Sequence, residues 1–160
     1  MRHLKTLLLI MVLLALDQFT KLAATAYLKG NDGISLIKGC LKLYYIENRV
    51  AAFGIFQGGQ IFFYIITAIV MGLLILFYIK MPPEKRSFPL RLCTIFLMSG
   101  AVGNFIDRVW HNYVVDFIYF ELIDFPVFNV ADIYVTCSAG VLAVLLLFVY
   151  KEEELFLRKK

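Results

Sequence analysis

The sequence predicts an all-α membrane protein with four transmembrane helices in one domain. Its 160 residues are 61% hydrophobic and only 18% charged. The mean hydropathy is +0.80, a value that soluble domains of this size rarely reach. No repeat relates the two halves, and no low-complexity linker divides the chain. Residues 1–160 are therefore interpreted as a single membrane domain.

The spans differ in how clearly they stand out. Residues 61–79 are nineteen consecutive uncharged residues, which at ~1.5 Å per residue match the ~30 Å hydrocarbon core of a bilayer. The last span is apolar after Asp132, whereas the first is interrupted by Asp17 and Lys21. The predicted spans are residues 6–28, 61–79, 88–107 and 131–150, with longer loops at 29–60 and 107–131.

The first span has an alternative interpretation. "MRHLK" followed by "TLLLIMVLLAL" is typical of a signal peptide, and residues 24–26 resemble a cleavage site. The segment "DQFTK" at residues 17–21 argues against removal, because an acid and a base are unusual in a disposable apolar region. We therefore expect the first span to remain in the protein.

Basic residues predict the orientation of the spans. Ten of the sixteen Lys and Arg residues flank one side: Arg2, Lys5, Lys80, Lys85, Arg86, Arg91, Lys151, Arg158, Lys159 and Lys160. Both termini are then cytoplasmic, and the loops at 29–60 and 107–131 are extracytoplasmic. The net charge of +4 follows mostly from this bias, so no nucleic-acid partner is expected. With two histidines and no cysteine cluster, no metal site is expected either.

Polar residues in the first and third spans need partners or a function, because an ionisable group in the bilayer costs ~2.5 kcal/mol or more. Asp17 and Lys21 are four residues apart and share a helix face. They form either a structural ion pair or a substrate-facing one. Asn104, Asp107 and Arg108 follow a small-residue pair, Ser99 and Gly103. Asn104, Asp107 and Arg108 have two interpretations. They form a cluster at the membrane interface in which Asp107 pairs with Arg108, or they hold the residues of a nearby polar site in place.

Two further aspartates lie in the second outer loop and directly after it. Asn129 and Asp132 open the last span on one helix face, where Asn129 could instead act as an N-cap. Asp116 lies between the apolar segments "YVV" and "FIYF". Glu121 and Asp124, in the same loop, are interpreted as ordinary solvated acids.

Asp116 and Asp132 can meet, because the loop between them begins and ends at the membrane surface. In a low-dielectric pocket both cannot be ionised, so the pair would hold one proton jointly. Aspartic proteases use such a pair to activate water and to protonate a peptide carbonyl. The alternatives are a small transporter or proton-relay protein, for which intramembrane charges are equally expected, and a purely structural membrane subunit.

Five sequence blocks in order resemble bacterial lipoprotein signal peptidase, the signal peptidase II family. They are "DQFTK" (17–21), "NRVAAFG" (48–54), "GAVGNFIDR" (100–108), "VVDF" (114–117) and "FNVAD" (128–132). The resemblance extends from about residue 6 to about residue 150. One departure is Val50, where the family usually has glycine, and its effect on peptide binding stays open.

The resemblance implies an intramembrane aspartic endopeptidase of the bacterial cytoplasmic membrane. It would cut prolipoproteins before a diacylglyceryl-modified cysteine, as a monomer in contact with membrane lipid and without a cofactor. It implies a small β-cradle from the first outer loop, where "CLKLYYIEN" already indicates a strand, and a short extracytoplasmic helix from the second. Asp116 and Asp132 would be the catalytic dyad. Positions that bind substrate or support the dyad would be Asp17, Lys21, Asn48, Gly103, Asn104, Asp107, Arg108, Asn129 and Ala131.

Overall fold

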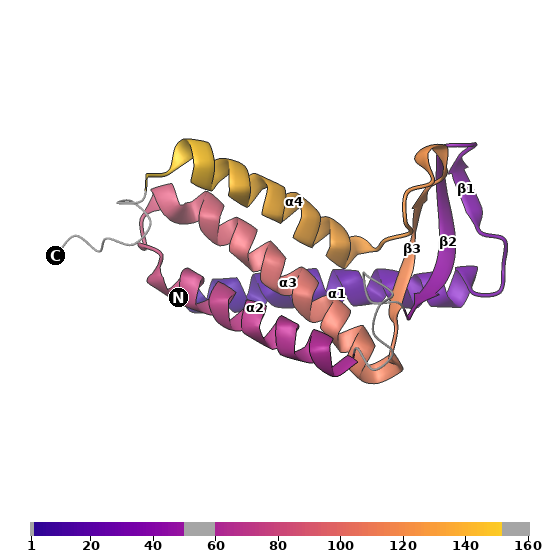
Figure 1. Cartoon of the computed structure of the whole chain (residues 1–160), viewed down its shortest axis with the longest axis horizontal. Coiled ribbons are helices and arrows are strands. Elements are labelled where there is room, and N and C mark those ends of the chain that lie inside the picture. The colour runs from indigo at the N-terminus through magenta and orange to yellow at the C-terminus, as the bar shows by residue number, and fades with distance from the viewer. Residues whose placement is uncertain (1, 50–59, 152–160) are drawn as a thin grey trace.

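The computed structural model describes residues 2–49 and 60–151. Within these ranges, four helices long and apolar enough to cross a membrane pack together, and a three-stranded sheet lies at one end of them (Figure 1). The helices are α1 (Arg2–Leu28), α2 (Gln60–Lys80), α3 (Phe88–His111) and α4 (Val130–Val144), which continues as a π-helical turn at Leu145–Val149. The strands are β1 (Ile34–Ile37), β2 (Leu41–Asn48) and β3 (Val114–Phe120). The predicted fold class is confirmed, and the chain is a multi-pass membrane protein.

The third helix continues beyond the predicted limit at residue 107. It ends at His111, and the next residue, Asn112, adopts a left-handed conformation with φ of 63°. The backbone N–H of Asn112 donates to the carbonyl of Arg108, which satisfies one of the free carbonyls at the helix end. The charged pair Asp107 and Arg108 therefore lies inside the helix and not in a loop.

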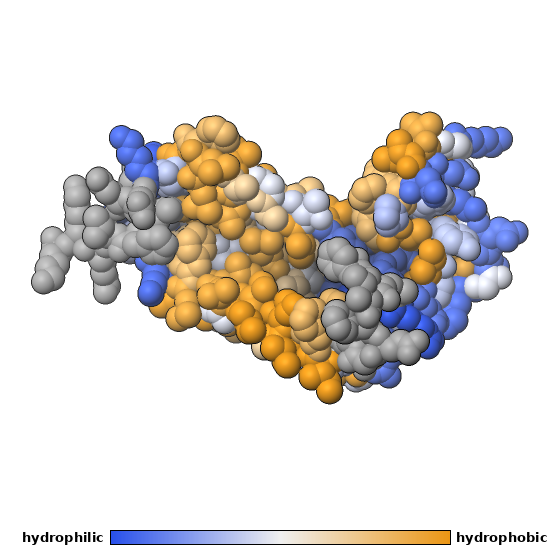
Figure 2. All heavy atoms as spheres, in the orientation of Figure 1, coloured by the Kyte–Doolittle hydropathy of each residue, from blue (hydrophilic) through white to orange (hydrophobic). Residues whose placement is uncertain are grey.

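Helix α3 is the centre of the bundle. It packs against α1, α2 and α4, and half of its apolar span is buried, compared with 6% for α2. Gly100 permits the approach of α4, because a Cβ atom there would lie 2.5 Å from the carbonyl oxygen of Ala131. Most of the remaining helix surface is apolar, whereas hydrophilic surface gathers around the sheet (Figure 2). This distribution is the one expected of helices that face lipid.

The sheet combines both of the predicted outer loops. Its strand order is β1-β2-β3 with antiparallel pairing throughout, so the first loop supplies two strands and the second supplies the third. Gly33 precedes β1 with φ of 83°, and a Cβ atom there would lie 2.4 Å from the carbonyl oxygen of Leu43. The close approach of the two strands at this point therefore requires glycine.

The second outer loop contains a short helix, as the resemblance implies, in the form of a 3-10 turn, and it also contains a strand that was not predicted. Its described residues form strand β3 and a single 3-10 turn at Glu121–Ile123. The run "VVDFIYF" is rich in β-branched and aromatic residues, which favour a strand, and it pairs with the edge of β2. Val115 and Phe117 anchor β3 by packing with Ala24 and Leu28 of α1.

Candidate active site

Asp116 is held in the middle of a polar network at the junction of sheet and helices. It lies on β3 and is only 2% exposed. Its Oδ2 accepts a hydrogen bond of 2.8 Å from Nδ2 of Asn48, and its Oδ1 accepts one of 2.6 Å from Nδ2 of Asn129. The register explains the first contact: Asp116 pairs with Ile46, so Asn48, two residues further along β2, is its diagonal neighbour on the same face.

Asp132 lies in the first turn of α4. Asn129 is the N-cap residue, and a capping box joins the two: Asn129 Oδ1 accepts from the backbone N–H of Asp132, and Asp132 Oδ2 accepts from that of Asn129, both at 3.0 Å. The other oxygen of Asp132 accepts from Nδ2 of Asn104 at 2.8 Å. Both interpretations of Asn129 therefore apply, because it caps α4 and also contacts Asp116.

Two amide side chains connect the carboxylates of Asp116 and Asp132. Nδ2 of Asn129, which donates to Asp116, also donates to Oδ1 of Asn104 at 3.1 Å, and Asn104 in turn donates to Asp132. The structure thus brings together the aspartates at the two ends of the second outer loop, with neutral amides between them.

Burial changes the acidity of Asp116. It raises the pKa of this carboxyl from 3.8 to about 6, and the negative charge of Asp132 acts in the same direction, whereas the hydrogen bonds from Asn48 and Asn129 oppose the rise. A carboxyl with this pKa keeps a proton over a wider pH range than an exposed aspartate does. Asp116 can therefore keep its proton up to about pH 6.

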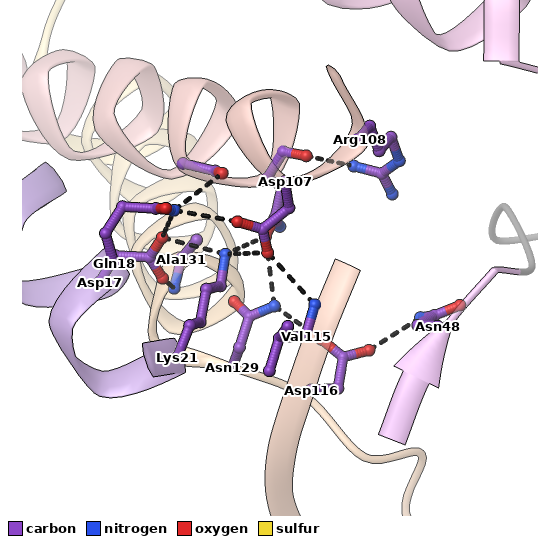
Figure 3. A network of polar contacts seen from close by, with 12 residues as sticks. Asp17, Gln18, Lys21, Asn48, Asp107, Arg108, Val115, Asp116, Asn129 and Ala131 are labelled. Carbon is purple, nitrogen blue, oxygen red and sulfur yellow. Dashed lines mark hydrogen bonds and ion pairs between the residues drawn. The ribbon is translucent and has the colours of Figure 1, made fainter. Parts of the chain in front are cut away.

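A buried ion cluster, consisting of Asp17, Lys21 and Asp107, lies beside the amides (Figure 3). Nζ of Lys21 is 2.9 Å from Oδ2 of Asp17 and 3.0 Å from Oδ2 of Asp107, and all three side chains are 3% exposed or less. Nζ also donates to Oδ1 of Asn104 at 2.9 Å. The predicted pair within α1 is therefore present, and its further partner is Asp107. The alternative that pairs Asp107 with Arg108 is wrong.

Each acid of the buried ion cluster also fixes the backbone next to a candidate aspartate. Asp17 Oδ1 accepts from the N–H of Ala131 at 2.9 Å, and Asp107 Oδ2 accepts from the N–H of Val115 at 3.1 Å. Ala131 directly precedes Asp132, and Val115 directly precedes Asp116. Lys21 thereby joins the acids that hold the two backbones, so α1 and α3 together position β3 and α4.

Gly103 and Arg108 have different surroundings. A Cβ atom at Gly103 would lie 2.5 Å from Oδ2 of Asp17, so a larger residue here would force the carboxylate of Asp17 to shift. Arg108 donates to the backbone oxygen of Asn104 at 3.1 Å, and its guanidinium lies 5.3 Å from the ring centre of Phe63. In Figure 3 its side chain points away from Lys21.

Gln18 was not selected from the sequence, although it belongs to this network. Its Nε2 donates to Asp107 Oδ1 at 3.0 Å, to Asp17 Oδ2 at 3.2 Å and to the carbonyl oxygen of Gly103 at 3.3 Å. The available signal was an uncharged polar residue next to Asp17 in an apolar span. Val50, the departure from the family pattern, lies outside the described residues.

The remaining acids of the second outer loop are peripheral. Glu121 and Asp124 are exposed, and Asp124 Oδ1 accepts a hydrogen bond of 2.6 Å from the hydroxyl of Tyr119. In the described part of the chain, neither forms a hydrogen bond or ion pair with the network of Asp116 and Asp132. They serve as internal controls for the proposed role of the buried acids.

Comparison with known families decides the identity of the fold. The sequence profile described as Signal peptidase (SPase) II matches residues 9–148. The chain belongs to the signal peptidase II family. Family membership makes it a membrane peptidase and confirms the resemblance found in the sequence blocks.

Individual signal peptidase II relatives match nearly the full length. The lipoprotein signal peptidase of Streptococcus thermophilus (strain CNRZ 1066) is 43% identical over 144 residues, which cover 90% of this chain and 91% of the relative. That of Clostridium novyi (strain NT) is 42% identical over 135 residues, covering 82% and 90%. A solved bacterial membrane enzyme superposes with a TM-score of 0.79 at 33% identity, over 91% of this chain and 94% of that one.

Proposed function

We propose that this chain is a lipoprotein signal peptidase in which Asp116 and Asp132 form an aspartic dyad. Its substrates are prolipoproteins, cut before the cysteine that carries a diacylglyceryl group. The shared amide of Asn129 is the observation that carries the proposal, because it connects Asp116 directly and Asp132 through the helix cap. The alternative of a transporter or proton relay is not favoured by the family to which the chain belongs.

The chemistry needs one proton on the dyad. The ionised carboxylate removes a proton from a water molecule while the water oxygen attacks the peptide carbonyl carbon, and the protonated partner donates to the carbonyl oxygen. The C–N bond then breaks as the nitrogen takes a proton from the dyad and a hydroxyl of the intermediate gives one to the other carboxylate, which leaves one proton on the dyad. The raised pKa of Asp116, about 6, supports this arrangement because the carboxyl keeps its proton to a higher pH than an exposed aspartate does.

The surrounding residues have three proposed roles. Asn48, Asn104 and Asn129 orient the carboxylates through the hydrogen bonds described above. The buried ion cluster and Ala131 position the backbones, and Gly103 provides the space that the cluster needs. Arg108 is the cation beside the dyad that remains outside the buried ion cluster, and we assign it to contact with the substrate backbone.

The proposed orientation places the dyad on the extracytoplasmic side. The start of α1 and the end of α4 lie at the opposite end of the bundle from the sheet (Figure 1). Six described basic residues in or beside the loops belong to that end, which favours the cytoplasm for it: Lys5, Lys80, Lys85, Arg86, Arg91 and Lys151. A lipid-modified signal peptide would then meet the dyad at the outer surface with its acyl chains in lipid. Both carboxylates and their amide partners come from one chain, so a monomer suffices.

The test uses purified protein in detergent with a diacylglyceryl-modified prolipoprotein. Asp116→Asn and Asp132→Asn are each expected to lower cleavage by at least about 10³-fold, in the range of general acid–base catalysis. Asp124→Asn is the matched control, because it makes the same change in the same loop at an exposed position, and it is expected to retain most activity. A dyad variant that cuts at the wild-type rate would remove that aspartate from the mechanism.

A further inference from the structure

Arg108 lies near the proposed dyad, but none of the described acids neutralises it directly. Its charge interacts with those of Asp132 and Asp116, yet among the residues that the structure describes no carboxylate lies within ion-pair distance of its guanidinium. Its Nη1 donates to the carbonyl oxygen of Asn104 at 3.1 Å, and this acceptor is neutral. The guanidinium can therefore donate to a carbonyl oxygen of a substrate, provided that the side chain keeps a fixed direction.

Two consecutive aromatic residues near the start of α2 contact Arg108. The centre of the Phe63 ring is 5.3 Å from the guanidinium carbon, which is within the range of a cation–π interaction. The hydroxyl of Tyr64 donates to the backbone oxygen of Arg108 at 3.1 Å, and this oxygen also accepts from the N–H of Asn112. Phe63 therefore holds the side chain of Arg108, and Tyr64 holds its main chain.

The packing of α2 on α3 fixes the two aromatic rings. The helices lie side by side (Figure 1), and the rings of Tyr64 and Phe105 meet edge to face with their centres 5.4 Å apart. Phe105 and Arg108 are three residues apart and share a face of α3. Phe63 and Tyr64 are both partly buried, whereas their neighbour Phe62 is exposed. The start of α2 is therefore aligned with the turn of α3 that carries Arg108.

We propose that Phe63 and Tyr64 are positioning residues, which hold the guanidinium of Arg108 in the direction in which it binds the substrate backbone. The proposal rests on the proposed function, which assigns Arg108 to that contact. A cation that is fixed before the substrate arrives loses less freedom on binding than a mobile one does. The two aromatic residues thus strengthen the binding of the prolipoprotein and leave the chemical step to the dyad.

The test measures kcat and KM of the full chain in detergent with a diacylglyceryl-modified prolipoprotein. Phe63→Leu keeps an apolar side chain but removes the ring that attracts the cation. It is expected to raise KM about fivefold, the factor that corresponds to ordering one long side chain on binding, with kcat nearly unchanged. Phe63→Tyr restores an aromatic face and should have the wild-type KM. The matched control is Phe148→Leu, the same change at a position that is 81% exposed at the other end of the bundle, and its KM should be normal.

A double-mutant cycle tests whether the aromatic residues act through Arg108. Tyr64→Phe removes only the hydroxyl and is expected to raise KM about threefold, as for the loss of one hydrogen bond. In the Arg108→Gln background neither Phe63→Leu nor Tyr64→Phe should raise KM further, because no cation remains to be positioned.

Three results would each overturn the proposal: a normal KM in Phe63→Leu, an equal rise of KM in Phe63→Tyr, or a rise that persists undiminished in the Arg108→Gln background. These results are distinct from a failure of the proposed function. A wild-type protein that does not cleave the prolipoprotein would overturn both proposals. An active wild type with an inactive Asp116→Asn variant and a normal Phe63→Leu variant would overturn only the role of the two aromatic residues.

Discussion

Two pairs of aspartates lie in one polar network, and they are held in opposite ways. Asp17 and Asp107 each lie within about 3 Å of the ammonium group of Lys21. Asp116 and Asp132 accept their hydrogen bonds from amide groups. An amide orients a carboxylate but does not neutralise it, whereas a cation stabilises its ionised form. The same residue type is therefore paired with a cation in one pair and held by neutral donors in the other.

The largest expected effect on stability comes from removing Lys21, the cation that Asp17 and Asp107 share. Lys21→Met keeps the apolar stem but leaves Asp17 and Asp107 buried without a positive charge, which typically costs about 3–5 kcal/mol. Denaturation of the purified protein in detergent measures this loss. Wild-type stability in the variant would mean that the buried ion cluster does not hold the bundle together.

The second prediction concerns how the stability of the folded protein depends on pH through Asp116. An unfolded aspartate has a pKa of 3.8, and burial raises that of Asp116 to about 6. The folded state binds this proton more tightly, so the stabilising contribution is complete below pH 3.8 and is lost as the pH rises through about 6. At ~1.36 kcal/mol for each pH unit, the loss is about 3 kcal/mol.

Asp116→Asn does not titrate, so it should unfold at a higher temperature than the wild type at pH 7.5. The difference between the two unfolding midpoints should shrink as the pH falls towards 4. If the difference is independent of pH, Asp116 titrates as an ordinary exposed acid, and the contrast between the two pairs disappears.

A smaller effect is expected from Gln18→Met. The change removes the donor that Asp17, Asp107 and the carbonyl of Gly103 share, while Lys21 still neutralises both acids. Unsatisfied buried acceptors cost about 1–3 kcal/mol, so the loss should be clearly less than that of Lys21→Met. Equal losses in the two variants would show that orientation matters as much as charge, which would revise the comparison.

The smallest expected effect is that of Lys29→Met. Lys29 is 2.8 Å from Oε1 of Glu47, but its side chain is 52% exposed, and exposed ion pairs contribute little to stability. The unfolding midpoint should equal that of the wild type within error. Because the substitution is the same as at Lys21, a large loss here would mean that burial does not explain the difference between the two lysines.

The sequence was sufficient for the four spans and for the family, because uncharged runs and ordered blocks are local signals. It was insufficient for the partner of Asp107. Sequence neighbours suggested Arg108, whereas the structure pairs Asp107 with Lys21, a residue on another helix. Adjacent residues on a helix point about 100° apart, so sequence proximity favours the wrong partner unless the packing of α1 on α3 is known.

The strand in the second outer loop was missed for a similar reason. The run from Val114 to Phe120 has an apolar character that suits a helix or a strand, and the edge of β2 selects the strand. That edge belongs to a segment about 70 residues earlier in the chain. The contact between Asn48 and Asp116 depends on the same pairing, so it could be inferred only through the family resemblance.

The hydrogen bond from Ala131 to Asp17 joins residues 114 positions apart. Asp17 already pairs with Lys21 inside α1, so the first helix can enter the bilayer as an electrically balanced unit while synthesis continues. The other carboxylate oxygen of Asp17, Oδ1, gains its donor, the N–H of Ala131, only when α4 packs beside α1. The polar network beside the sheet is therefore completed only when the first and the last helix of the chain meet.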